Sequence, residues 1–350
     1  MKTFNLIFAP AGSMSETFGR AKIHTFLKMT DENRNALLND TQGRGMGEKG
    51  ISYLAGFFML IAFGVGGMFI GGLLGIPVAA AISGKSIAFI TENISTLAGD
   101  RTYLREMQVI QTFSAVFGFL LPTWFTASRL SWSPMKLTGF KGVIAGRDLL
   151  LTVFITVAAL ALSGALGYFT YKLPFPVDWR IAFDKMEKGY AETAAGIINL
   201  DSVPELLISI VVLALVPAVC EEAFFRGGLQ NYLYRNTGRL WVSVIVVSVI
   251  FSAVHFSAYG FLSRLALGII LGLLYQYSGR LWLSILAHFI NNATAVLVMY
   301  VARLDGKSMQ AVLSDKEGSY LGFLSIPVII FLFIQYRKNT KNSLTATDGV

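Results

Sequence analysis

The chain has 350 residues, of which 54% are hydrophobic and only 14% are charged, whereas a soluble domain is about 25% charged. This composition excludes an ordinary soluble globular protein and is typical of a protein embedded in lipid. The net charge of +8 does not indicate nucleic-acid binding, because the Lys and Arg residues are scattered between apolar segments and form no basic stripe. A single cysteine, Cys220, excludes an intramolecular disulfide and a cysteine-based metal cluster.

The first 50 residues are mixed in charge and interrupted by glycines, and their one apolar patch is too short for a cleavable signal peptide. We interpret residues 1–50 as a cytosolic arm with a helix over residues 16–39. The first long apolar segment after this arm is expected to act as a retained signal anchor.

Eight apolar segments follow, each near the ~20 residues that a helix needs to cross ~30 Å of hydrocarbon. They cover residues 51–82, 108–127, 148–171, 205–225, 240–259, 261–277, 281–302 and 319–336. If the N-terminus lies inside, the inner segments carry more Lys and Arg residues than the outer loops. In this count Arg264 is a residue of an outer loop. The sequence therefore predicts an all-α, multi-pass protein of the cell membrane with both termini in the cytoplasm.

Two further patterns concern the surroundings of these segments. The outer loop over residues 172–204 mixes acidic, aromatic and apolar residues, which fits either an amphipathic helix lying on the membrane or a plain linker. Glycines recur at helical spacing in the first and sixth segments and predict close contacts between helices: Gly67, Gly71, Gly75, Gly268 and Gly272.

Ionisable side chains inside a transmembrane helix cost ~2.5–3.5 kcal/mol each on insertion scales, and most of the predicted spans avoid them. The exception is the stretch over residues 205–302. It holds polar side chains within or beside apolar helices: Glu221, Glu222, Arg226, His255, His288, Asn291 and Asn292. Their concentration in one stretch predicts a functional site.

The spacing of these residues has consequences for geometry, since residues four apart share a helix face. Glu222 can therefore pair with Arg226 and leave Glu221 to point into a cavity. His288 and Asn292 share a face in the same way, as do Phe251 and His255 on the fifth span. Pro217, four residues before Glu221, is expected to bend its helix and make room for water.

Such a set of residues can hydrolyse an amide. A carboxylate hydrogen-bonded to an imidazole can take a proton from water, and Glu221 with His255 could form this base. Imidazole and amide donors stabilise the negative charge that grows on the carbonyl oxygen, and His288 with Asn292 could supply them.

Three segments resemble the motifs EExxxR, FxxxH and HxxxN of the CAAX-prenyl-protease-like intramembrane endopeptidases, also called the ABI or CPBP family: EEAFFR at 221–226, FSAVH at 251–255 and HFINN at 288–292. The resemblance covers about residues 205–295 and implies about eight transmembrane helices around a central polar cavity. It also implies that Glu221 and His255 activate water and that His288 and Asn292 form the oxyanion site. Glu222, Arg226 and Phe251 would support them.

We accordingly divide the chain into an N-terminal arm (1–50), N-terminal transmembrane helices with the outer loop (51–204), a catalytic transmembrane core (205–302) and a last helix with a short cytosolic tail (303–350). We favour a mechanism without a cofactor. Zinc is the alternative, with Glu221, His255 and His288 as its ligands, although the chain lacks a His-Glu-x-x-His motif.

The predicted function is cleavage of a membrane-associated peptide or protein within the lipid bilayer, with no nucleic-acid partner. One alternative is a catalytically silent scaffold or immunity-type protein of the same fold. A less favoured one is a proton-coupled transporter, because the sequence has no internal repeat. The natural substrate and the oligomeric state are not determined by the sequence.

Overall fold

The computed structural model describes residues 45–97, 100–142, 144–307 and 318–347, with side chains up to Thr340 in the last segment. The chain divides into two compact units, Met1–Met46 and Gly47–Val350, and every helix in the described residues belongs to the second unit. The predicted cytosolic arm and its helix over residues 16–39 lie outside the described residues, apart from residues 45–50.

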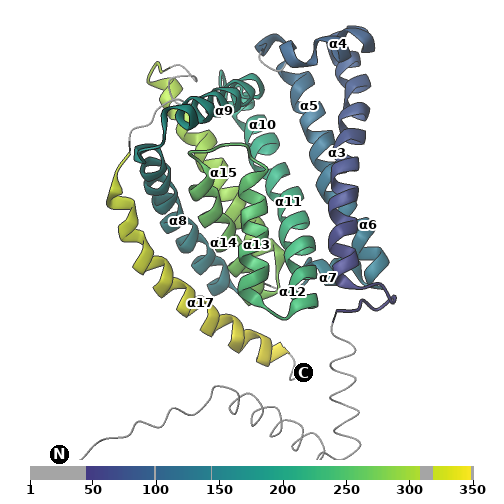
Figure 1. The fold of residues 1–350 in the computed structure, drawn as a ribbon, viewed down its shortest axis with the longest axis vertical. Coiled ribbons are helices and arrows are strands. Elements are labelled where there is room, and N and C mark those ends of the chain that lie inside the picture. Colours follow the sequence, from purple (N-terminus) through teal and green to yellow (C-terminus); the bar gives the residue numbers. More distant parts are fainter. Residues whose placement is uncertain (1–44, 98–99, 143, 308–317, 348–350) are drawn as a thin grey trace, which may run out of the picture. The chain divides into compact units, whose positions relative to one another are not determined.

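Seven helices within the described residues are long and apolar enough to cross a membrane. They are α3 (Tyr53–Ser83), Arg101–Leu130, α8 (Gly146–Lys172), Val203–Thr237, α14 (Phe261–Ser278), α15 (Leu281–Leu304) and Tyr320–Thr340, the last containing most of α17 (Ser325–Thr347). The fifth predicted span, residues 240–259, corresponds to α13 (Leu240–Ala253), which is apolar but shorter. No β-strand occurs in the described part of the chain, so the predicted all-α membrane fold is confirmed (Figure 1).

Two of the long helices change type along their length. The first runs through α5 (Leu104–Ala115), the π-helical η2 (Val116–Leu120) and α6 (Leu121–Leu130). The second runs through α10 (Val203–Ile210), the π-helical η3 (Val211–Leu215), α11 (Val216–Glu222), the π-helical η4 (Ala223–Gln230) and α12 (Asn231–Thr237). Pro217 has no N–H to donate to the carbonyl of Leu213, so the disturbance predicted at this proline takes the form of a π-helical segment just before it.

The helix α3 packs along α5 and η2 (Figure 1). It exposes large apolar side chains such as Phe69 and Leu73, as a surface in contact with lipid requires. A Cβ atom at Gly67 would lie 2.0 Å from the carbonyl oxygen of Phe117, so the two backbones approach closely only because this residue is glycine. The close contact predicted for the glycines of the first span is therefore confirmed.

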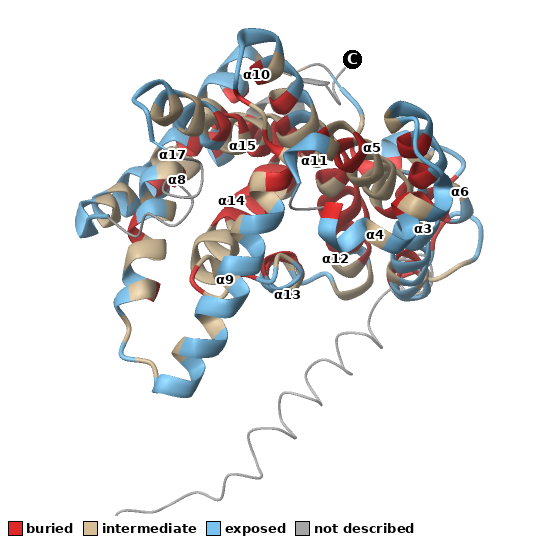
Figure 2. Ribbon diagram, turned by 90° about the horizontal axis from the view of Figure 1, so that it is seen from above, coloured by how far each residue is buried: buried red, intermediate tan, exposed pale blue. Residues whose placement is uncertain are grey.

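Three further helices connect the seven apolar ones: α4 (Ile87–Leu97), α7 (Pro134–Thr138) and α9 (Val177–Ile197). The helix α9 occupies the predicted outer loop, so this loop contains a helix rather than a plain linker. It buries only Gly196, and most of its surface is exposed (Figure 2).

The helices that follow α9 build the core in which the polar residues lie. The helix α15 packs against α11, α14 and α8, and α13 packs against α14. Buried residues concentrate on α14 and α15, whereas α3 exposes much of its apolar surface (Figure 2). Glu221 lies near the middle of the long helix Val203–Thr237.

Candidate active site

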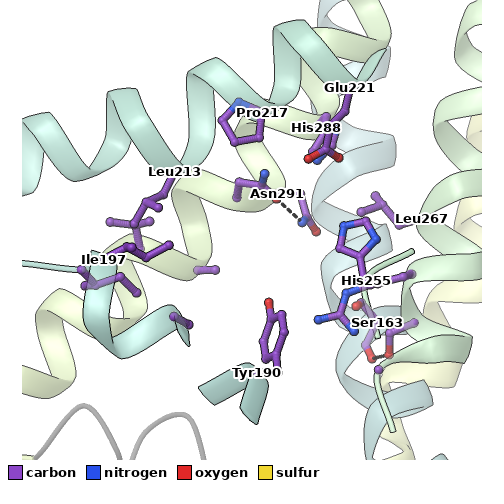
Figure 3. A pocket seen from close by; sticks show the side chains of 18 of the residues that line it. Ser163, Tyr190, Ile197, Leu213, Pro217, Glu221, His255, Leu267, His288 and Asn291 are labelled. Carbon is purple, nitrogen blue, oxygen red and sulfur yellow. Dashed lines mark hydrogen bonds between the residues drawn. The ribbon is translucent and has the colours of Figure 1, made fainter. Parts of the chain in front are cut away.

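The predicted site residues come from three helices and one turn. Glu221 lies on α11, Phe251 on α13, and His288 with Asn292 on α15. Together with His255 they line one cavity of about 540 Å³ (Figure 3). The convergence that the sequence predicted for these side chains is therefore present.

His255 does not have its predicted position on a helix. The helix α13 ends at Ala253, and His255 lies in the following turn. The next residue, Phe256, has a φ of 50°, in the left-handed region that residues other than glycine rarely adopt. No glycine or proline marks this end, and the apolar Val254 and Phe256 continue the run, so the sequence suggested a longer helix.

The ring of His255 is oriented by a backbone carbonyl of the preceding helix, α13. Its Nδ1 atom lies 2.6 Å from the carbonyl oxygen of Phe251. A carbonyl oxygen can only accept, so Nδ1 carries the hydrogen in this contact. The neutral ring therefore keeps its lone pair on Nε2, which is the atom able to take a proton or hold a water.

Buried charged groups hold the ring of His288 in position. Nη1 of Arg226 donates to Oε1 of Glu222 at 2.8 Å, which confirms the predicted pair. The same Oε1 atom lies 2.8 Å from Nδ1 of His288, a contact that the sequence did not predict. Oε1 of Glu222 accepts from Arg226 and from Nδ1 of His288, so Nε2 of His288 is left for a substrate.

Phe251 separates the two imidazoles. Its ring meets that of His255 edge-on with the centroids 4.8 Å apart, and that of His288 in the same way at 5.8 Å. The guanidinium carbon of Arg226 lies 4.5 Å from the centroid of the Phe251 ring. This aromatic ring therefore contacts both histidines and the arginine, which agrees with a supporting position for it.

Glu221 has an unpaired oxygen beside the cavity. Its Oε2 atom is buried and has no hydrogen-bond partner among the described residues. The hydrogen bond expected between Glu221 and His255 is not formed in this part of the chain, because Nδ1 of His255 is used by Phe251. A buried carboxylate oxygen without a partner is costly, and a small molecule such as water would satisfy it.

The amides on α15 are joined to each other. Nδ2 of Asn291 donates to Oδ1 of Asn292 at 3.1 Å, and both residues line the cavity (Figure 3). The contact orients the Asn292 amide so that its own NH₂ group remains available. The sequence included Asn291 among the polar residues but assigned it no role; its place next to Asn292 was the only signal for one.

An arginine and a tyrosine are among the cavity residues that the sequence analysis missed. Arg264 was counted as a cation of an outer loop, but it lies in the first turn of α14 and lines the cavity. Tyr190 of α9 lines the cavity as well (Figure 3). The position of Arg264, one turn into an apolar segment, was the available signal, whereas nothing in the sequence distinguished Tyr190 from other loop aromatics.

The residues do not fit a preformed metal centre. Among the described residues, no group of three His, Cys, Asp or Glu side chains is placed to ligand one ion. The alternative ligand set of Glu221, His255 and His288 is therefore not assembled around a common point in this structure.

The fold is that of an all-α integral membrane protein with a polar cavity among its helices. Residues 203–294, about a quarter of the chain, match the family model described as type II CAAX prenyl endopeptidase Rce1-like. The matched segment contains Glu221, His255, His288 and Asn292, and it agrees with the family that the three motifs indicated. No curated protein and no solved structure matches the chain. The matching family is one of peptidases, which supports protease activity at the level of the family.

Proposed function

We propose that the protein is an intramembrane endopeptidase that hydrolyses a peptide bond in a membrane-associated substrate. One observation carries the proposal: Glu221, whose buried Oε2 has no hydrogen-bond partner among the described residues, lines the same cavity as His255, His288 and Asn292. A carboxylate in this position is available to take a proton from a bound water. The peptidase family matched by residues 203–294 supports the same activity.

In this proposal a water molecule lies between Glu221 and Nε2 of His255. Glu221 removes a proton from the water, and the oxygen forms a bond to the carbon of the peptide carbonyl. The proton then passes to the peptide nitrogen, the C–N bond breaks, and a carboxylic acid and an amine are released. His255 holds the water in line through Nε2, since its Nδ1 is engaged with the carbonyl of Phe251.

The charge that develops on the carbonyl oxygen needs donors. The NH₂ group of Asn292 is one, because its Oδ1 is occupied by Asn291. His288 donates through Nε2 only when its ring is doubly protonated, since a neutral ring has its one hydrogen on Nδ1 toward Glu222. Glu222 accepts from Nδ1 of His288 and is itself held by Arg226, so Glu222 and Arg226 act by positioning His288.

The proposal is tested by incubating the purified full-length protein in detergent with a mixed peptide library and identifying the cleaved bonds by mass spectrometry. Glu221→Gln and His255→Ala are expected to abolish cleavage without loss of the folded protein. Glu192→Gln is the matched control, because this carboxylate is exposed on α9 and forms only a 3.8 Å pair with Lys188. Cleavage retained by both site variants would contradict the proposed mechanism, whereas absence of cleavage by the wild-type protein would favour a catalytically silent scaffold.

A chelator tests the zinc alternative. Cleavage that survives extended treatment with EDTA, in protein shown by elemental analysis to be free of zinc, supports the proposed metal-free mechanism. Cleavage that stops with the chelator and returns with zinc would instead assign Glu221, His255 and His288 to a metal.

A further inference from the structure

Two further pockets adjoin the short helix α7, at the end of the bundle where α12 also lies (Figure 1). The first has a volume of about 240 Å³ and the second a volume of about 370 Å³. Lys136 of α7 lines the first pocket and its neighbour Met135 lines the second, so the two pockets flank the same helix. Neither pocket shares a lining residue with the cavity that contains Glu221.

The smaller pocket is basic. Its lining includes three cations, Lys136, Lys141 and Arg235, and no aspartate or glutamate. The ion pairs found among the described residues involve none of these three side chains. Glu48, an acid at the same end of the bundle, accepts from the hydroxyl of Ser131 at 2.8 Å. The pocket therefore carries positive charge that a bound anion would balance.

The arginine of this pocket is held by a buried amide. Oδ1 of Asn231 accepts from Nε of Arg235 at 2.9 Å, and Nδ2 of the same amide donates to the carbonyl of Leu137 at 2.6 Å. The guanidinium carbon of Arg235 also lies 5.5 Å from the centroid of the Tyr53 ring. Its two terminal nitrogens form no hydrogen bond within the described part of the chain, and such a pair of donors is suited to the oxygens of a phosphate.

The larger pocket is lined mainly by apolar side chains of α6, α7, α11 and α15, among them Leu121, Trp124, Met135, Phe140, Val219 and Trp282. Leu121, Trp124 and Trp282 are exposed, as a surface in contact with lipid requires. Trp282 is the second residue of α15, and indole rings are typical of the membrane interface. Val219 lies near the middle of the long helix Val203–Thr237. The pocket therefore extends from the interface toward the hydrocarbon region, which is the path of an acyl chain.

We propose that the two pockets together bind one anionic phospholipid, with its phosphate at Lys136, Lys141 and Arg235 and an acyl chain in the apolar pocket. A basic pocket directly beside an apolar one is complementary to an anionic amphiphile, whereas a soluble anion or a neutral lipid would use only one of the two. The orientation predicted from the sequence places this end of the bundle at the cytoplasmic leaflet, where basic pockets between helices bind anionic head groups. The inference goes beyond the proposed hydrolysis and does not depend on it.

The first test is native mass spectrometry of the full-length protein, purified in a nonionic detergent. Phosphatidylglycerol and phosphatidylcholine with identical oleoyl chains are added in equal amounts, so that the two lipids differ only in the head group. We expect the first bound lipid to be phosphatidylglycerol in about 10-fold excess, the size of a charge-assisted hydrogen bond. Equal binding of the two lipids would overturn the inference.

Variants of the cations connect this preference to the basic pocket. The triple variant Lys136→Gln, Lys141→Gln and Arg235→Gln is expected to bind the two lipids equally, and it is expected to remain folded because all three side chains are exposed. Arg239→Gln is the matched control, since this arginine is also exposed, follows the end of α12 and does not line the pocket. The control is expected to keep the full preference. A preference that survives the triple variant would refute the proposed phosphate site.

A substitution in the apolar pocket distinguishes a phospholipid from a free phosphate. Leu121→Trp fills part of this pocket and is expected to weaken phosphatidylglycerol binding by about 10-fold, because less of the acyl chain is buried. Val65→Trp, at an exposed position of α3 outside the pocket, is the control and is expected to bind as wild type does. Inorganic phosphate in large excess is expected to leave the lipid bound. Displacement by phosphate, or unchanged lipid binding by Leu121→Trp, would indicate a site for a free anion and overturn the proposal.

Discussion

The helices before and after residue 200 are held together by different means. The contact between α3 and α5 with η2 depends on shape, since glycines of α3 lie directly against backbone carbonyls of the partner helix. The contact of α11 and η4 with α15 depends instead on buried charged groups: Arg226 of η4 pairs with Glu222 of α11, which accepts from His288 of α15. Lipid offers no hydrophobic drive for helix association, so both solutions are available to a membrane protein.

The difference indicates where function lies. Small residues give close packing at little cost, whereas buried ionisable groups are expensive and are retained where chemistry needs them. In the proposed function, the helices before residue 200 mainly support the site, and the helices after it position the reacting groups. Four experiments test this division, beginning with the largest expected effect.

Glu221→Gln tests whether the polar half carries the reaction. The amide cannot take a proton from water, so peptide cleavage is expected to fall by about 100- to 10,000-fold, the range for loss of a general base. Thermal unfolding in detergent is expected to change little, because Oε2 of Glu221 has no hydrogen bond to lose among the described residues. A variant that is both active and equally stable would remove Glu221 from the mechanism.

Glu222→Ala tests the buried chain of charges. It leaves Arg226 unpaired in the core and His288 without its acceptor, and we expect a loss of about 3–5 kcal/mol in the free energy of unfolding. The double variant Glu222→Met with Arg226→Met removes both charges at once and is expected to be more stable than the single variant, yet inactive. A single variant that is as stable as wild type would show that this chain does not hold the helices together.

Much of this architecture could be predicted from the sequence, because bilayer thickness and the cost of buried charge leave few choices. Seven of the eight predicted spans correspond to helices long enough to cross a membrane, and the pair of Glu222 with Arg226 followed from helical spacing. The hydrogen bond that His288 donates to Glu222 could not be predicted, since it joins residues that are 66 apart in sequence and depends on how two helices dock.

The two errors, the end of α13 and the position of Arg264, have separate physical causes. The helix α13 ends at Ala253, shortly before Phe256, which has a positive φ. Because Phe256 is not a glycine, the sequence does not indicate this helix end. Arg264 is indistinguishable in one sequence from a loop cation, because a guanidinium at the edge of an apolar segment can turn either to water or into a cavity. Patterns in a sequence thus place helices well and side chains in turns poorly.

Gly67→Ala tests the apolar half. The added Cβ would lie 2.0 Å from the carbonyl oxygen of Phe117, which cannot move as a flexible side chain can. We expect a loss of about 1–3 kcal/mol in the free energy of unfolding, typical of overpacking, with unchanged activity per folded molecule. Gly66→Ala is the control, because nothing lies within 4 Å of its added Cβ. Equal stability of the two variants would show that α3 does not pack by close backbone contact.

The smallest effect is expected at Glu187, which connects α9 to the turn that carries His255. Its Oε1 accepts from the Ser257 hydroxyl at 2.8 Å and from the Tyr259 backbone N–H at 3.1 Å. Glu187→Ala removes both acceptors, so His255 is positioned less well, and we expect kcat to fall by about 3- to 10-fold with little change in KM, roughly the value of one hydrogen bond.

Glu187→Gln distinguishes positioning from a general loss of stability. Its amide oxygen can still accept from Ser257 and Tyr259, so it is expected to restore most of the kcat that Glu187→Ala loses. A Glu187→Ala protein with unchanged kcat would mean that the turn keeps its shape without α9. In that case the positive φ of Phe256 and the hydrogen bond from His255 to the Phe251 carbonyl are sufficient to position the imidazole.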